Sequence, residues 1–478
     1  MKPSKDAPGP FSWSGIREAI QFRRHPIVFL QDLSQRYGDV VHFRLGWKHA
    51  FLLNHPDLAQ EFLVAHASKH SRGPVMQRGR AVMGEGLLTS EEPLHAAQRR
   101  LIQPAFHRER ISHYATVMAE YASRACRGWH SGQVLDLHEE MMRLTLSILG
   151  ETLFGTQIQE DAREIGEAVT ELMSLVDLVF VPFSRYLTHL PLPGMGRLKN
   201  VRMRLDRFIY GLIDERLRSG EERGDLLSTL LHRQLAEGNS AHALRQVRDE
   251  CVTILLAGHE TIANALTYAL FLMAQHPGHA QRVRAEVDQI AGPRELGADN
   301  FDQLVFTRCV VAESMRLYPP VWVLGRTITQ PCSVGPYTAP AGSILFVSQY
   351  LLHRDSRFFP APTTFDPDRF RERSQVPRFA YFPFGLGPRR CIGEAFAWME
   401  GVLALGTMLR HWEIELLPQT TLVLDPKVTL RPKLPVLVRV TAVPKRDAMP
   451  RADAGETVLP SSGAHTEPRP TTRLAAGR

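Results

Sequence analysis

The sequence predicts a mainly helical fold with a smaller β region, and two patterns of apolar residues support this prediction. From about residue 95 to 275, apolar side chains recur with the spacing of amphipathic helices. Over 39–53 and again over 321–350, apolar and polar residues alternate as they do in strands. Because the strand-like segments come from distant parts of the chain, we expect one domain over 14–443 with a β region built from both ends.

The elements before residue 95 are short. An amphipathic stretch over Ile16–Tyr37 predicts helix. The alternation over Asp39–Leu45 and Ala50–Leu53 predicts two strands of a hairpin around the turn Gly46–His49. A further helix-like run follows over 58–65, after a proline that suits the start of a helix.

The helical part is interrupted at Pro104, around 182–196 and at 220–224, where proline and glycine gather. Its longest apolar stretch, Cys251–Ala274, is long enough to span a membrane. Glu260 lies near the middle of that stretch, and a glutamate facing lipid is costly. We therefore expect a helix buried in a protein core.

The two ends of the chain differ from this pattern. Short strands are predicted at 321–324, 337–340 and 343–348. The tail over 444–478 is rich in Pro, Arg, Ser and Thr and predicts disorder, and a flexible segment is expected over 1–13. That first segment is polar and has no apolar anchor, so we expect no membrane anchor.

Composition narrows the class of protein. The chain has 478 residues, of which 44% are hydrophobic and 22% charged, as in ordinary globular proteins. Its net charge of +7 suits an acidic protein partner or a generic solvated surface, and no arginine-aromatic array indicates nucleic acid. The five cysteines are scattered without Cys-x-x-Cys pairs, which argues against a disulfide framework and predicts a cytoplasmic protein.

The segment Phe384–Gly393 places one cysteine in a glycine-rich turn, after two arginines and before a helix-like stretch. Cationic neighbours and a helix N-terminus favour the thiolate form that binds metal. The glycines allow a broad flat ligand to lie close, and backbone N–H groups after Cys391 are placed to point at the sulfur. The alternative is a buried free cysteine in a turn.

This segment matches the haem-ligand signature of the cytochrome P450 family, F-x-x-G-x-R-x-C-x-G, at every fixed position. The chain resembles that family over roughly residues 8–443. The resemblance implies the cytochrome P450 fold with a single haem domain. It also implies haem b (iron protoporphyrin IX) as the cofactor, with Cys391 as the ligand of its iron.

The central helix carries a second motif, Ala257-Gly258-His259-Glu260-Thr261. A threonine hydroxyl can bond to a preceding carbonyl, so the helix is expected to bend or open here. The family has the pattern A/G-G-x-D/E-T, which implies that Thr261 bonds the bound dioxygen and Glu260 supplies protons through water. This chain departs from the family at Ile262, where a second Thr or Ser is frequent. The alternative is a packing threonine beside a satisfied glutamate; His259 is expected to turn away from the haem.

Two further sets of residues match the family. Glu313 and Arg316, at i and i+3, suggest a surface salt bridge by themselves, but the resemblance implies that they form a buried brace with Arg369. His95, Arg99, Arg326 and Arg389 match the usual partners of the haem propionates, although each is also compatible with a solvated basic side chain. Their neighbours Arg100 and Arg390 are expected in an electron-donor docking patch.

The implied reaction is that of a monooxygenase. It activates dioxygen with two electrons and two protons and inserts one oxygen atom into a hydrophobic small molecule, such as a terpene, a fatty-acyl or a polyketide-like compound. The segments expected to face the substrate are 74–89, 173–186, 321–324 and 428–430. Electrons are expected from a separate ferredoxin and ferredoxin reductase, and the protein is expected to be a monomer. The alternatives are a peroxide-dependent peroxygenase, an isomerase and a non-catalytic haem sensor.

Overall fold

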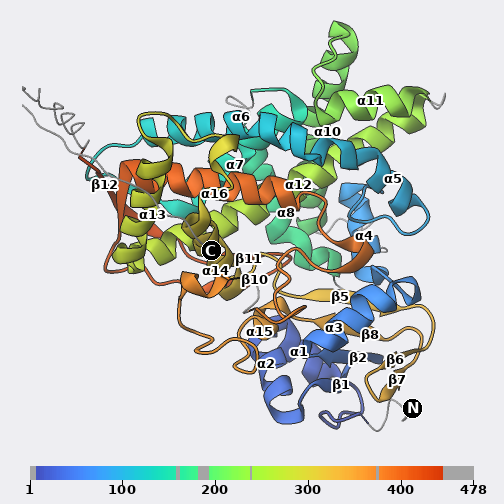
Figure 1. Cartoon of the computed structure of the whole chain (residues 1–478). Helices are drawn as coiled ribbons and strands as arrows, with labels where there is room; N and C mark the ends of the chain where they lie inside the picture. The colour runs from blue at the N-terminus through green and yellow to red at the C-terminus, as the bar shows by residue number, and fades with distance from the viewer. Residues whose placement is uncertain (1–6, 158–161, 181–192, 237–239, 373–375, 445–478) are drawn as a thin grey trace, which may run out of the picture. The chain divides into compact units, whose positions relative to one another are not determined.

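The computed structural model describes residues 7–157, 162–180, 193–236, 240–372 and 376–444 (Figure 1). The described residues up to Ala442 form one compact unit. The tail predicted to be disordered lies outside the described residues from 445 onward, as do residues 1–6 of the predicted flexible segment. This compact unit is mainly helical with smaller sheets, as the sequence predicted.

The α-helices of the described residues are α1 (Ile16–Arg24), α2 (Pro26–Tyr37), α3 (Pro56–Gln60), α4 (Gly73–Met83), α5 (Leu94–Ile102), α6 (Arg108–Arg127), α7 (Leu137–Phe154), α8 (Ala162–Phe180), α10 (Pro193–Ser219), α11 (Leu226–Ala236), α12 (Ser240–Gln275), α13 (Pro277–Ala291), α14 (Val305–Leu317), α15 (Gln349–Leu352) and α16 (Glu394–His411). A π-helical turn, η2, covers Glu61–Ala65. The 3₁₀ turns are η3 (Ala67–Lys69), η4 (Gln103–Phe106), η5 (Ala298–Asn300), η6 (Pro367–Phe370) and η8 (Gly387–Arg389).

The strands are β1 (Val40–Leu45), β2 (Lys48–Leu53), β3 (His70–Ser71), β4 (Val134–Asp136), β5 (Leu324–Ile328), β6 (Cys332–Val334), β7 (Tyr337–Ala339), β8 (Ile344–Val347), β9 (Trp412–Leu416), β10 (Leu424–Pro426), β11 (Leu430–Pro432) and β12 (Leu437–Ala442). They form a five-stranded sheet in the order β1-β2-β8-β5-β3, a three-stranded sheet in the order β4-β12-β9, and the pairs β6-β7 and β10-β11.

The larger sheet joins the two distant parts of the chain, as predicted. Strand β2 pairs in parallel with β8, with Ala50 opposite Ile344. The β1-β2 hairpin is also confirmed, but its turn is shorter than expected, because Leu45 already pairs with Lys48. Gly46 adopts a positive φ of 61°, which lets the chain reverse within two residues.

Several predicted boundaries are wrong for local reasons. The stretch 16–37 forms two helices, because Pro26 begins α2 and its ring excludes the hydrogen bond that would continue α1. The strand expected over 321–324 starts only at its last residue. Strands β3, β4, β6 and β9–β12 were not predicted, since strands this short show too little alternation to identify.

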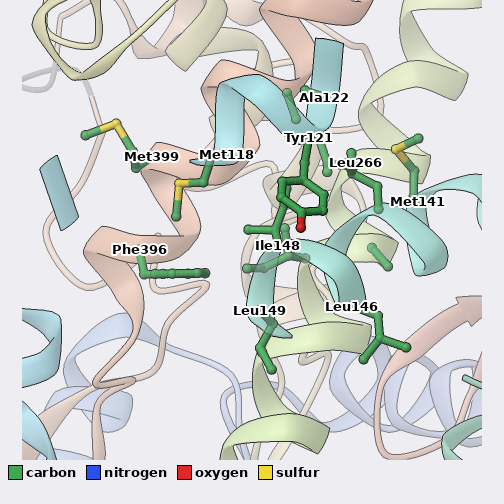
Figure 2. Packing of buried hydrophobic residues seen from close by; sticks show 14 of the residues in the cluster. Met118, Tyr121, Ala122, Met141, Leu146, Ile148, Leu149, Leu266, Phe396 and Met399 are labelled. Carbon is green, nitrogen blue, oxygen red and sulfur yellow. The ribbon is translucent and has the colours of Figure 1, made fainter. Parts of the chain in front are cut away.

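The helical core centres on α12, which packs against α7. A Cβ atom on Gly258 of α12 would lie 2.5 Å from Cδ1 of Leu149 on α7, so this glycine permits the close approach of the two helices. Figure 2 shows residues of α6, α7, α12 and α16 in one cluster, among them Met118, Leu266 and Phe396. The stretch 251–274 is therefore a buried core helix, and among the described residues no helix is both long and apolar enough to cross a membrane.

Candidate haem site

The cysteine loop is held by backbone contacts that only glycine permits. Gly387 has a φ of 72°, and a Cβ atom there would lie 2.1 Å from the carbonyl oxygen of Leu63 in η2. The Cys391 N–H donates to the carbonyl of Phe384 at 2.9 Å, which closes the turn. Helix α16 begins just after this turn, at Glu394. Cys391 is exposed, whereas the other four cysteines are buried.

The protein around the sulfur does not by itself favour the thiolate. Although Cys391 is exposed, desolvation by the surrounding protein raises the pKa of its thiol to about 11. A hydrogen bond from the Gly393 backbone and the charges of Arg99 and Arg390 lower this pKa, but by less. The N–H groups that follow the cysteine therefore point at it as predicted, while the predicted thiolate requires a further positive charge, such as a bound metal ion.

Three predicted residues lie together in a buried basic cluster. Arg326 and His95 are 5% and 3% exposed, and Arg389 donates to the carbonyl of Ser90 at 2.7 Å and to Glu91 at 3.1 Å. Burial and the charge of Arg389 lower the pKa of Arg326 to about 10. Burial, followed by the same charge, lowers the pKa of His95 to about 4. Burial thus disfavours the charged forms of both Arg326 and His95.

Arg72 is a further member of this cluster that the sequence did not reveal. It follows the short strand β3, and β3 pairs with Thr327 and Ile328 of β5, next to Arg326. Burial and the charges of Arg326 and Arg389 lower the pKa of Arg72 well below its ordinary value. The only sequence signal was an arginine after a two-residue strand, which no periodicity identifies.

The cluster has the chemistry of a site for an anionic group. The Nε atoms of Arg72 and Arg326 are buried and have no hydrogen-bond partner among the described residues. A buried, unpaired donor is costly unless a ligand accepts from it. The two carboxylates of a haem would supply such acceptors, so this donor set and the thiol of Cys391 together fit a haem.

Arg99 makes a different contact from the other predicted propionate partners. Its Nη1 donates to the carbonyl of Arg390 at 2.8 Å, directly beside the cysteine. The side chain of Arg390 is 56% exposed and pairs with Glu394. Arg99 therefore supports the cysteine loop from α5, and its predicted role toward a propionate stays a prediction.

One face of α12 near its middle is open to solvent, whereas the neighbouring residues of the helix are buried. Ala257 is exposed, and Gly258, Thr261 and Ala265 are partly exposed, at the spacing of a single helix face. The Thr261 hydroxyl donates to the carbonyl of Ala257 at 2.7 Å, as the sequence suggested. Helix α12 is continuous from Ser240 to Gln275, so the helix is not interrupted at this motif.

Glu260 is 2% exposed and is held by a residue of the segment 428–430, which was expected to face the substrate. Its Oε1 accepts a hydrogen bond of 2.6 Å from Thr429, in the turn between β10 and β11. Thr429 also accepts from Asn264 at 3.4 Å, and Asn264 Oδ1 lies 3.1 Å from Nε2 of His138. Oε2 has no partner among the described residues.

Burial raises the pKa of Glu260, and the hydrogen bond from Thr429 and the charge of Arg431 oppose this shift. The carboxyl group is therefore poised to hold a proton inside the core. His259, in contrast, turns toward α7 and lies 2.9 Å from the carbonyl of Met142, so it takes no part in the open face.

The predicted brace is present and fully buried. Arg316 donates to both oxygens of Glu313 at 2.7 and 2.8 Å, and neither side chain is exposed. Arg369 Nε lies 3.5 Å from Glu313 Oε1. Arg316 also donates to the carbonyl of His353, whose ring accepts from the Phe382 N–H at the start of the cysteine loop. The brace thus connects α14 to that loop.

The segments predicted to face the substrate give a mixed result. Met76 and Met83 of α4 are partly exposed, and Leu87 is buried. Trp322, in the predicted segment 321–324, does not face an open site: it is 4% exposed, packs in a cluster with Phe346 and Leu430, and donates to the carbonyl of Lys427 at 2.9 Å. Residues 181–186 lie outside the described residues, as do the side chains of 173 and 176–180.

Comparisons with known proteins agree with this geometry. A sequence model of the cytochrome P450 family matches residues 7–439. Cyclooctatin synthase of Streptomyces melanosporofaciens is 35% identical over 434 residues, which cover 89% of this chain and 93% of that protein. Cyclooctat-9-en-7-ol 5-monooxygenase of the same organism is 35% identical, covering 87% and 90%. Pentalenene oxygenase of Streptomyces avermitilis is 33% identical, covering 84% and 90%. The chain belongs to the cytochrome P450 family and is a monooxygenase that uses molecular oxygen.

Proposed function

We propose that this protein is a haem b monooxygenase that oxygenates a hydrophobic small molecule of the terpene class. The observation that carries the proposal is the pairing of an exposed thiol, Cys391, with a buried basic cluster whose donors lack acceptors. Haem bound through a thiolate supplies the cleavage of the O–O bond. Cys391 would hold the iron, and Arg72, His95, Arg326 and Arg389 would hold the propionates.

The open face of α12 provides the polar groups on the other side. The Thr261 hydroxyl now donates to Ala257, and it can turn its proton to an acceptor on the open face instead. Glu260 holds a proton more readily than an exposed glutamate, and its Oε2 is free of protein partners among the described residues. We assign Thr261 the positioning of oxygen and Glu260 the supply of protons.

The assignment of the substrate class rests on the apolar character of the compounds in the names of two relatives. The names of two relatives specify an alkene, pentalenene, and an alkenol, cyclooctat-9-en-7-ol. A terpene fits that character better than a fatty acid, whose carboxylate needs a cationic partner. Ferredoxin and ferredoxin reductase as electron donors, a cytoplasmic setting and a monomeric state belong to the same proposal. The five cysteines, an odd number scattered along the chain, support a reducing cellular compartment.

The first experiment is a carbon monoxide difference spectrum of the reduced, haem-loaded protein. Thiolate ligation requires the strongly red-shifted Soret band, and Cys391→Ala should lose it. Cys332→Ala, which removes a buried cysteine in β6, is the matched control and should keep the band. Folded, haem-loaded protein without this band would refute the thiolate assignment.

The second experiment separates the alternatives. The protein is supplied with ferredoxin, its reductase and isotopically labelled dioxygen, and terpene hydrocarbons and fatty acids are compared by the Soret shift they cause and by label in the product. Label from dioxygen in a terpene product is expected. Label only from peroxide would indicate a peroxygenase, a rearranged product without label an isomerase, and haem binding without any product a sensor.

A further inference from the structure

Large apolar side chains are exposed in the residues before α1, on α1 itself and in the β1-β2 turn of the larger sheet. Phe11, Trp13 and Trp47 are 88%, 84% and 73% exposed, and Ile16 and Ile20 of α1 are 60% and 48% exposed. We call these five residues and the exposed arginines of α1 the apolar-basic surface. Exposed aromatic clusters of this kind mark interaction sites, because burying them in a partner releases them from water.

Backbone contacts bring these residues together from two segments. The rings of Phe11 and Trp13 lie 6.3 Å apart, and Arg44 of β1 donates to the carbonyl of Trp13 at 2.9 Å. The Gly46 N–H, next to Trp47 in the β1-β2 turn, donates to the carbonyl of Gly15 at 3.1 Å. Figure 1 likewise shows α1 beside β1. The turn and the start of α1 therefore form one continuous surface.

Helix α1 adds positive charge to the same face. Arg17, Arg23 and Arg24 are exposed, and at 100° per residue they flank the row formed by Ile16 and Ile20. The one acidic residue of α1, Glu18, lies on the opposite face of the helix, where it is buried and accepts a hydrogen bond from Ser12. The exposed face of α1 thus consists of isoleucines flanked by arginines.

We propose that the apolar-basic surface binds the surface of an anionic lipid membrane. Tryptophan and phenylalanine side chains prefer the membrane interface, and arginine is attracted to anionic headgroups. The exposed isoleucines of α1, flanked by arginines, have the pattern of a helix that lies in that interface. An acidic protein would also match this charge, and vesicle flotation distinguishes the two partners. With nine residues α1 is too short to span a bilayer, so the contact is peripheral. A peripheral contact of this kind is compatible with the expectation of no membrane anchor.

Vesicle flotation of the haem-loaded protein tests the proposal. Binding is measured with vesicles of phosphatidylcholine containing phosphatidylglycerol, and with phosphatidylcholine alone, at low and high salt. Binding should need the anionic lipid and should weaken with salt, because salt screens the arginines. Arg17→Gln/Arg23→Gln/Arg24→Gln should lower the affinity on the order of 100-fold, since each basic residue near such a surface contributes roughly fivefold.

The apolar part is tested separately. Trp13→Ser/Trp47→Ser should lower the affinity for the anionic vesicles by roughly tenfold or more, because it removes apolar area and leaves the charge unchanged. Leu434→Ser, at a site that is 50% exposed elsewhere in the chain, is the apolar control. Every variant should keep the carbon monoxide spectrum of the wild type, which shows that any loss of binding is not a loss of fold.

The charge control is Arg127→Gln/Arg218→Gln/Arg233→Gln, which removes three exposed arginines from other helices. It has the same net charge as the α1 variant and should bind like the wild type. Equal loss in both triple variants would reduce the effect to net charge and overturn the proposal. So would failure of the wild type to float with anionic vesicles. If the α1 variant instead slowed reduction by ferredoxin and left flotation unchanged, the surface would be a protein docking site.

Discussion

Replacing Glu313 by glutamine should destabilise the protein strongly, because it removes only the charge of a fully buried pair. Glutamine has nearly the shape of glutamate, so no cavity forms. Arg316, which is 0% exposed, would remain charged beside Arg369, which is 11% exposed, and both now contact the Glu313 carboxylate. Breaking one partner of a buried pair costs about 3–5 kcal/mol. That is a large part of a typical folding free energy of about 5–15 kcal/mol.

The measurement is urea unfolding of the haem-loaded protein, followed by fluorescence and by haem absorbance. The free energy of unfolding should fall by about 3–5 kcal/mol, and the haem band should be lost at lower urea, because the brace contacts the cysteine loop. Asp32→Asn is the matched control. Asp32 pairs with Arg36 at 2.7 Å, but the two side chains are 47% and 67% exposed, so its loss should cost at most about 1 kcal/mol.

Two outcomes would refute this reasoning. One is a Glu313→Gln variant as stable as the Asp32→Asn variant. The other is full recovery in Glu313→Leu/Arg316→Met. Replacing a buried pair with apolar residues is often neutral, but here Arg316 also serves three backbone carbonyls, those of His353, Pro362 and Thr364. These carbonyls would be left unpaired, so the double variant should stay destabilised.

Three further predictions follow from single contacts. Thr261→Ala should raise the amount of peroxide released per product formed. Thr267→Ala removes the same type of bond on the buried face of α12 and should leave that ratio unchanged. Equal ratios in both variants would remove the role assigned to the Thr261 hydroxyl. Burial raises the pKa of Glu250 from an ordinary value of 4.5 to about 7, so stability falls as the pH rises through 7. Glu250→Gln should abolish that fall of about 3 kcal/mol in urea unfolding, and an unchanged pH slope would contradict it. Gly387→Ala should impair folding and haem retention far more than Gly132→Ala. Both glycines have a positive φ, but only a Cβ atom on residue 387 would clash with a backbone atom, the carbonyl oxygen of Leu63. Equal losses in the two variants would disprove the effect of the clash.

The site could be predicted from the sequence where its residues form a local motif. Cys391 and its flanking glycines lie within ten residues, and the acid and alcohol of α12 are adjacent, so their spacing alone carries the signal. The same holds for Glu313 and Arg316, one helical turn apart. Within the described residues, the structure confirmed the helical core, the β1-β2 hairpin and the buried brace.

The remaining features depend on contacts between distant segments. Arg72 joins Arg326 only because β3 pairs with β5, and Glu260 meets Thr429 only because the β10-β11 turn lies against α12. The raised pKa of the Cys391 thiol could not be predicted from its neighbours in sequence, because desolvation depends on everything packed around the sulfur.

The sequence by itself thus indicated the family, the cysteine loop and the reaction class, since each depends on particular residue types at short spacings. Tertiary structure decided which buried side chains lack partners, in which acids burial raises the pKa, and which apolar side chains stay exposed. The physical reason is that burial and pairing are properties of the packed chain. Phe11, Trp13 and Trp47 become one surface only when the hairpin turn lies beside α1.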